Sequence, residues 1–337
     1  MNHDGYMFHQ FKTCFCVFKS LDGIWNMIYI KQSKDLICYN IIQNQIINQI
    51  IKDKYQPNDI RHHLDTQLKR DLILISYAMS NEFEVCNFKN FQIIVKISHI
   101  NNGGFLFSAC FYNDNNNIYI ITSDNKVTNI HQTECMKVFD LKKNKIKEIP
   151  NSNEDTFYID TYYDSKLDNN FLVSCNSGHI NFYDFKKNSL FKKYESDCSY
   201  SKIRDYLIND KEDNKVLIGS NFYSILIWDF YGGELIKKIG YGNKDFYGIF
   251  LLNKNYLLTG VVDKNHYPNS YPILIELTNK KNFNKIKADL DKPISCIKSI
   301  DTENGKLIIC GGRWSDIIIL ENKELEFKVK TIIEQAA

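Results

Sequence analysis

The sequence predicts an all-β fold, a β-propeller of seven four-stranded antiparallel blades, and two observations indicate it. The first is the alternating apolar stretch 225–230, which contains the pair Trp228–Asp229 and is followed by a turn at 231–233. The second is that weaker copies of this stretch recur, with polar anchors at Asn40, Asn87, Asp140, Asp184, Asp229, Glu276 and Glu321. The gaps between anchors are 47, 53, 44, 45, 47 and 45 residues. A near-constant period of this length is typical of a propeller, with one four-stranded blade per repeat.

Seven such repeats account for nearly all of the 337 residues, so we expect one domain at 12–333, with tails at 1–11 and 334–337. Apolar runs bounded by turn-forming residues predict the strands. In blades 1 and 2 these are 13–18, 24–30, 36–42, 46–51, 60–63, 72–77, 83–88 and 92–97. In blades 3 and 4 they are 105–112, 118–122, 136–141, 145–149, 157–162, 171–175, 180–185 and 189–194. In blades 5 to 7 they are 202–207, 215–219, 224–230, 235–239, 247–252, 256–261, 273–277, 283–286, 294–300, 306–310, 316–320 and 326–332.

The second strands share a pattern of apolar residues followed by small ones, seen at 173–175, 218–220, 258–260 and 309–312. Small residues suit a buried strand at which neighbouring blades lie close together. A strand that is covered on both faces reads as an apolar run rather than a strict alternation. These strands are therefore expected in the interior of each blade.

Composition excludes several classes of protein. The net charge is +2, from 42 basic and 40 acidic residues, which argues against nucleic-acid binding as the main role. The 10 cysteines are scattered through apolar runs, so we interpret them as free buried thiols of a reducing cytoplasm. The sequence has no basic-then-apolar leader and no apolar run long enough to span a membrane. We therefore expect a cytoplasmic protein that does not bind membranes.

The pairs Trp228–Asp229, Tyr183–Asp184 and Phe139–Asp140, each at the end of an expected third strand, resemble the signature of WD-repeat β-propellers. Asp124 and Asp263 stand where that family often places a turn aspartate. The resemblance covers residues 12–333, but the family's Gly-His pair before each first strand is missing. The resemblance implies a rigid platform that binds peptides or partner proteins and rarely catalyses a reaction.

No pattern in the sequence indicates catalytic chemistry, a metal or a cofactor. His62 and His63 are adjacent, so on a strand they point to opposite faces, and no Cys-x-x-Cys pair offers zinc ligands. The glycine pairs 103–104, 232–233 and 311–312 lack the spaced lysine of a phosphate loop. No nucleophile elbow occurs, and most aspartates fall in turns. We therefore expect a protein that is not an enzyme.

The candidate partner-binding residues are aromatic, histidine and arginine side chains in the loops between second and third strands and between blades. They are Trp314, Arg313, Tyr223, Phe222, Tyr267, His266, His179 and Tyr241. These loops emerge on one face of a propeller, and such residue types are enriched at interface hot spots. Trp314 is the strongest candidate, since an exposed tryptophan beside an arginine indicates a partner. The alternative is that several of these side chains pack over the blades.

Two further features suggest surfaces. The insertion 123–135 in blade 3 lies on the same loop face and is polar. Lysines recur near the fourth strands, at 142–147, 186–187, 192–193, 237–238 and 280–281. They either form a basic face for acidic partners or guard the exposed edge strands against pairing, and we favour the second interpretation.

The function predicted from the sequence is a non-catalytic scaffold that binds a peptide or partner protein on the loop face. The alternative is a propeller enzyme or small-ligand binder that uses the central channel. A third hypothesis is a structural subunit of a larger complex. The sequence itself does not identify the partner.

Overall fold

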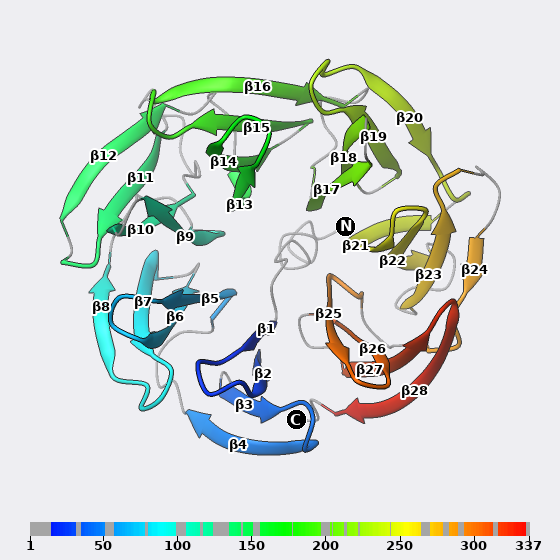
Figure 1. Cartoon of the computed structure of the whole chain (residues 1–337), viewed down its shortest axis with the longest axis horizontal. Helices are drawn as coiled ribbons and strands as arrows, with labels where there is room; N and C mark the ends of the chain where they lie inside the picture. The colour runs from blue at the N-terminus through cyan, green and yellow to red at the C-terminus, as the bar shows by residue number, and fades with distance from the viewer. Residues whose placement is uncertain are drawn as a thin grey trace, which may run out of the picture. The chain divides into compact units, whose positions relative to one another are not determined.

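The computed structural model describes residues 15–31, 35–50, 57–77, 80–98, 106–114, 117–123, 135–142, 144–150, 156–176, 178–196, 203, 205–211, 214–221, 223–242, 244–263, 270–278, 283–288, 293–312 and 316–334. Within these ranges the chain forms strands β1 to β28 and no helix. The strands make seven four-stranded antiparallel sheets, each with its strands in chain order (Figure 1). The predicted all-β, seven-bladed propeller is therefore confirmed.

The chain divides into two compact units, and blades 1 to 4, apart from Tyr194 and Glu195 at the end of β16, belong to the unit Phe15–Lys193. Blades 1 and 2 consist of β1 (Phe15–Lys19), β2 (Trp25–Ile30), β3 (Leu36–Asn40), β4 (Gln45–Ile50), β5 (Asp59–Asp65), β6 (Arg70–Tyr77), β7 (Glu82–Asn87) and β8 (Ile93–Ile97). Blades 3 and 4 consist of β9 (Ala109–Asp114), β10 (Asn117–Thr122), β11 (Cys135–Asp140), β12 (Lys145–Pro150), β13 (Thr156–Asp164), β14 (Asn169–Asn176), β15 (His179–Asp184) and β16 (Ser189–Glu195). The first strands of these blades lie side by side, with β1 against β5, β5 against β9 and β9 against β13.

Blades 5 to 7 belong to the other unit. Their strands are β17 (Asp205–Lys211), β18 (Asn214–Ser220), β19 (Ile225–Asp229), β20 (Leu235–Ile239), β21 (Lys244–Asn253), β22 (Tyr256–Asp263), β23 (Ser270–Glu276), β24 (Phe283–Lys285), β25 (Cys296–Thr302), β26 (Gly305–Gly311), β27 (Ile317–Lys323) and β28 (Glu326–Ile333). The alternating apolar stretch 225–230 contains β19. Its Trp228 is fully buried and donates its indole N–H to the Glu195 carbonyl at 2.9 Å.

The polar anchors end the third strand in six blades, and most of their side chains hold the turn that follows. The Asn40 side-chain oxygen accepts the amide of Gln43 at 2.9 Å, and the Asp184 carboxylate accepts that of Lys187 at 3.0 Å. Asp140 accepts the amides of Lys142 and Asn144 in the same way. The short polar side chain thus caps backbone donors at the tip of the hairpin, which is why Asx residues recur there.

The hairpin of the third and fourth strands carries a bulge immediately before the anchor in five blades. One residue of the fourth strand is thereby left without a partner across the ladder. The extra residue is Ile47, Ile94, Ile146, Ile236 or Lys330, as the registers on either side of it show. Equivalent positions in different blades can therefore be compared residue by residue.

Burial follows the order of the strands. The second strand β22 is buried from Leu257 to Val262, whereas every residue of the fourth strand β4 before Ile50 is exposed. The small residues of the second strands have the predicted role, because a Cβ on Gly260 would lie 2.4 Å from the Ile294 carbonyl of the next blade. The seven cysteines whose side chains the structure describes form no disulfide with one another, and six of them are buried, as expected.

Most strands differ from the predicted bounds by a few residues, and β17, at Asp205–Lys211 rather than 202–207, β21 and β9 are examples. β21 begins at Lys244 and ends at Asn253, beyond the expected 247–252, because bulges let the ladder continue past an irregular register. β9 begins at Ala109 rather than at 105. Ser108, the residue before this strand, forms two hydrogen bonds with Ser123, the residue after β10. The Ser108 amide donates to the Ser123 hydroxyl, and the Ser108 carbonyl accepts from the Ser123 amide.

A candidate protein-interaction groove

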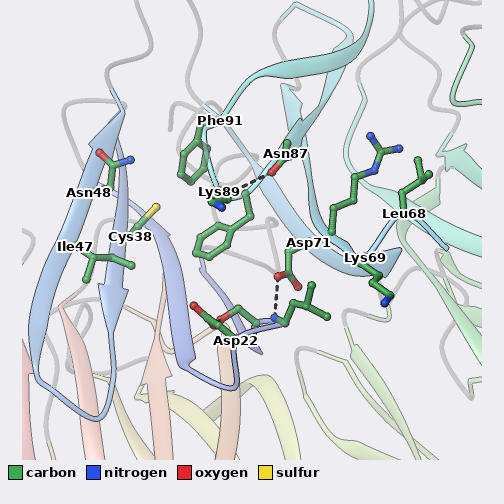
Figure 2. Close-up of a pocket in the computed structure, with 14 residues that line it drawn as sticks. Asp22, Cys38, Ile47, Asn48, Leu68, Lys69, Asp71, Asn87, Lys89 and Phe91 are labelled. Carbon is green, nitrogen blue, oxygen red and sulfur yellow. Dashed lines mark hydrogen bonds between the residues drawn. The ribbon is translucent and has the colours of Figure 1, made fainter. Parts of the chain in front are cut away.

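An open pocket of about 810 Å³ lies between blades 1 and 2, and we call it the blade 1–2 groove. It is lined by Ser20, Leu21, Asp22, Cys38, Ile47, Asn48, Leu68, Lys69, Arg70, Asp71, Asn87, Phe88, Lys89 and Phe91. Figure 2 shows Ile47 and Asn48 of β4 on one side, facing Leu68, Lys69 and Asp71 of blade 2 across the groove. The groove therefore opens between a fourth strand and the turns of the next blade.

Blades 3 and 5 bridge the equivalent junction with a lysine from the fourth strand. The Lys147 ammonium of β12 donates to the Phe185 carbonyl of blade 4 at 2.5 Å and lies 3.5 Å from the Phe185 ring centroid. The Lys237 ammonium of β20 donates to the Leu277 carbonyl of blade 6, also at 2.5 Å. Each acceptor is the residue after a third-strand anchor. We call this contact the lysine latch.

Blade 1 has no lysine at the latch position. Lys147 and Lys237 each pair with the residue two places before their anchor, Val138 and Ile227. In blade 1 the residue with this pairing is Asn48, opposite Cys38. The Asn48 side chain is too short to span the space and instead accepts the Gln49 amide through its own Oδ1 at 2.8 Å. The groove therefore lies at a junction without a latch; blades 2, 6 and 7 also lack a lysine at this position, where they have Val95, Asn284 and Thr331.

The floor of the groove is aromatic. The Phe88 ring packs edge-on against Phe18 at 4.9 Å and against Phe91 at 5.7 Å between centroids. Phe88 and Phe91 also pack on the buried core that blades 1 and 2 share. This floor is rigid, because aromatic edge contacts and core burial fix both rings.

The rim of the groove exposes aliphatic side chains. Leu68 is 64% exposed, Leu21 53% and Ile47 46%. Ile42 and Ile46 extend this apolar surface along blade 1, at 53% and 59% exposure. Single exposed apolar residues are ordinary, but several of them gathered around a pocket indicate a binding surface.

The unpaired charge at the rim is mainly basic. Lys69 and Lys89 are exposed and form no ion pair with any residue that the structure describes. Arg70 is bound by Asp65 at 2.9 Å. Asp22 is exposed and is engaged by the Ser20 hydroxyl and by the Ile24 amide. A ligand in the groove would therefore meet two free ammonium groups.

The other carboxylate of the groove, Asp71, is already satisfied. One oxygen lies 2.8 Å from His62 Nε2, and the other accepts the Leu21 amide at 2.9 Å. His62 stacks on Phe18 with ring centroids 4.0 Å apart. Burial lowers the pKa of His62, and the Asp71 carboxylate opposes this shift only in part. A neutral His62 donates to Asp71, so this cluster ties blade 2 to the turn of blade 1.

A second polar cluster joins the first strands of blades 2, 3 and 4. The Arg61 guanidinium contacts Asp59 at 3.1 Å, the Tyr158 hydroxyl at 3.0 Å and Asp160 at 3.4 Å. The Ser108 hydroxyl donates to Asp59 at 2.8 Å. Burial raises the pKa of Asp59, against the opposing effects of Arg61 and Ser108. Since these groups satisfy one another, we assign this cluster a role in holding the blades together.

The predicted partner-binding residues are only partly described. Phe222, His266, Tyr267, Arg313 and Trp314, with most of the insertion 123–135, lie outside the described residues. Tyr223 is 56% exposed in the loop between β18 and β19. His179 opens β15 and is 3% exposed. The Tyr241 ring stacks on Phe283 with centroids 4.3 Å apart, so Tyr241 packs against a blade, as the alternative interpretation of these side chains expects.

The groove is not among the sites predicted from the sequence, although one sequence signal indicates it. Each of the fourth strands β8, β12, β16, β20, β24 and β28 contains a lysine. β4, which reads QIINQI, contains no charged residue. This comparison of fourth strands distinguishes blade 1 from the other blades. The latch shows that two of the fourth-strand lysines, Lys147 and Lys237, contact the next blade, in addition to any role in guarding the exposed edge strand.

Two structural findings and two comparisons with known proteins bear on the site. Among the described residues, no cluster of His, Cys, Asp or Glu is arranged to hold a metal ion. Nor does any helix in the described ranges have the length and apolarity needed to cross a membrane. A scan against protein-family models finds no matching family, and a search of curated proteins finds no match.

Proposed function

We propose that this chain is a non-catalytic protein-interaction scaffold of the WD-repeat type, located in the cytoplasm, and that the blade 1–2 groove is a partner-binding surface. The observation that carries the proposal is the open groove, with an aromatic floor, an exposed aliphatic rim and two unpaired ammonium groups. Concave surfaces with buried aromatic anchors and a polar rim are typical of protein-recognition sites.

The framework under the groove supports this function. The Asn87 side chain and carbonyl accept the amides of Lys89 and Phe91, so the turn that carries both residues is held at two points. The Asp65 carboxylate accepts the Leu68 amide at 3.1 Å. Side chains on such fixed turns bind with a small loss of conformational entropy.

A second binding surface on the loop face remains part of the proposal. Tyr223 is the exposed, described member of the residues predicted there. An exposed tyrosine on a short loop is a suitable hot-spot residue, since it offers a large contact area with few rotatable bonds. The two surfaces can be tested separately because they use different turns of the blades.

The experiment is affinity purification of the tagged chain from its native cells, followed by mass spectrometry. Asn48→Lys introduces a latch lysine and fills the groove, while Ile146→Lys adds a lysine at a bulge position away from it. Tyr223→Ala tests the loop face. We expect a partner protein to be retained by wild type and Ile146→Lys and lost by Asn48→Lys.

Loss of the partner with Tyr223→Ala alone would move the binding surface to the loop face. A wild-type chain that retains no partner protein would contradict the scaffold function. Each variant is first compared with wild type by thermal unfolding, so that loss of the fold is not read as loss of the site.

A further inference from the structure

The turns that border the groove in blade 2 contain residues that the backbone disfavours. Lys69 has φ +47° and Phe91 has φ +53°, both in the left-handed region. This region is costly for residues other than glycine, asparagine and aspartate. Two non-Asx residues with this conformation therefore border one groove.

Most equivalent turns elsewhere in the chain use the residues that this conformation favours; Glu324 in the turn between β27 and β28, with φ +59°, is an exception. The fourth residue after the anchor is Phe91 in blade 2 but Asn44 in blade 1, Asn188 in blade 4 and Gly233 in blade 5, all with positive φ. These turns show that an Asx residue or glycine satisfies the same backbone.

The turn between the first and second strands of blade 2 also has a long side chain where an equivalent turn has an Asx residue. Four residues after Asp65 stands Lys69, whereas four residues after Asp164 in blade 4 stands Asp168, with φ +46°. Blade 2 therefore has a long side chain in place of a favoured turn residue at both turns of the groove. Strained positions that persist in this way indicate a functional requirement for the side chain.

We propose that the blade 1–2 groove binds an extended peptide segment of a partner protein in which aliphatic residues are followed by acidic ones. This inference rests on the proposed function and specifies the chemistry of the partner. The aliphatic side chains would pack between Ile47, Leu68 and the Phe88–Phe91 floor. The acidic residues would pair with the ammonium groups of Lys69 and Lys89.

Charge complementarity selects this occupant. Of the acidic groups near the groove, Asp71 is buried and binds His62 and Leu21, Asp65 binds Arg70, and Asp22 is exposed and accepts from Ser20 and Ile24. Lys69 and Lys89 are exposed on two turns of blade 2, so the exposed ammonium groups outnumber the one exposed carboxylate and a basic segment would meet like charges. A carboxylate between these lysines gains a charge-assisted contact that weakens as salt is added.

The test is selection of a random-peptide phage library on the purified wild-type chain, with counter-selection on Asn48→Lys. We expect the enriched peptides to share aliphatic residues followed by aspartate or glutamate. A consensus that is basic, or no enrichment over Asn48→Lys, overturns the inference. Concentration-dependent dimers that Asn48→Lys abolishes would assign the groove to a second copy of the chain and also overturn it.

A charge-reversal experiment then tests the lysines with an enriched peptide. We expect Lys69→Glu/Lys89→Glu to weaken binding about tenfold or more, and a peptide with lysines in place of its acidic residues to bind this variant better than wild type. Lys142→Glu is the matched control, because Lys142 follows its anchor Asp140 at the same distance as Lys89 follows Asn87 and is exposed outside the groove. Equal loss with Lys142→Glu would show a general charge effect and contradict the site.

The outcomes separate this inference from the proposed function. If no acidic peptide is selected while the native partner is still lost by Asn48→Lys, the peptide chemistry is wrong and the scaffold function stands. If Asn48→Lys also retains the native partner, the groove is not a binding surface and this inference falls, while the scaffold function then rests on the loop face.

Discussion

Asn48 and Lys147 occupy the same position in their blades, opposite the residue two places before the third-strand anchor, yet only Lys147 reaches the next blade. The Lys147 ammonium donates to the Phe185 carbonyl and lies over the Phe185 ring. The blade 3–4 junction is therefore bridged by a lysine, whereas Asn48 bonds to the neighbouring Gln49 amide and leaves the blade 1–2 groove unbridged.

Exchanging these residues tests the latch. We expect Lys147→Asn to lower the free energy of unfolding by about 1–2 kcal/mol, because it removes a hydrogen bond and a cation–π contact. Asn48→Lys should leave the free energy of unfolding unchanged or raise it by up to about 1 kcal/mol. Urea unfolding of both variants measures these changes. Equal stability of Lys147→Asn and wild type would show that the latch contributes nothing.

Replacing Lys69, a turn residue with positive φ, tests whether its side chain serves the fold or the binding of a peptide. We expect Lys69→Asn to raise the free energy of unfolding by about 0.5–1 kcal/mol, because asparagine tolerates the left-handed backbone. The same variant should bind an acidic peptide several-fold more weakly, since one ammonium group is lost. Chemical unfolding and a peptide titration give the two values. A variant that is more stable and binds equally well would exclude Lys69 from the site.

The Arg61 cluster should be essential for stability. We expect Arg61→Met to cost about 3 kcal/mol, because Asp59 is left buried without its cation. Asp59→Asn added to Arg61→Met should recover part of this loss, since it removes the buried carboxylate. The double-mutant cycle is measured by urea unfolding. Strictly additive losses would indicate that the two side chains do not interact.

We expect the free energy of unfolding to depend on pH through His62. Its pKa in the folded chain is lowered by burial, so its contribution is present above the unfolded value of about 6.5 and is lost as the pH falls through the folded value. His62→Gln keeps a donor near Asp71 without titrating. We expect the wild type to lose more stability than His62→Gln between about pH 7.5 and pH 5.5. His63, whose pKa is lowered by burial and by the neighbouring His62, titrates in both chains.

Much of the fold follows from the sequence, because each blade repeats the same local chemistry. Asp184 and Asp229 mark the ends of third strands since a short carboxylate caps the turn that follows. Gly260 marks a close approach of two blades because a Cβ does not fit there. These signals are local and periodic, so they can be read before the structure is seen.

The groove could not be predicted in the same way. Its opening depends on which residue of β4 falls opposite Cys38, and the bulge at Ile47 shifts that register by one residue. The Arg61 cluster joins three blades that are far apart in the sequence. Phe91 reads as an ordinary apolar residue until its backbone conformation is known. Each feature depends on contacts between repeats, which a repeat pattern alone does not specify.

Methyl NMR of the labelled chain, titrated with a peptide of the selected acidic–aliphatic type, tests the central claim most directly. Ile47 and Leu68 line the groove, while Ile146 and Ile236 are the bulge residues of other blades and serve as internal controls. The account predicts saturable shifts of the Ile47 and Leu68 methyl signals, with the Ile146 and Ile236 signals unchanged. Shifts confined to residues near Tyr223, or equal shifts at all four methyl positions, would contradict it.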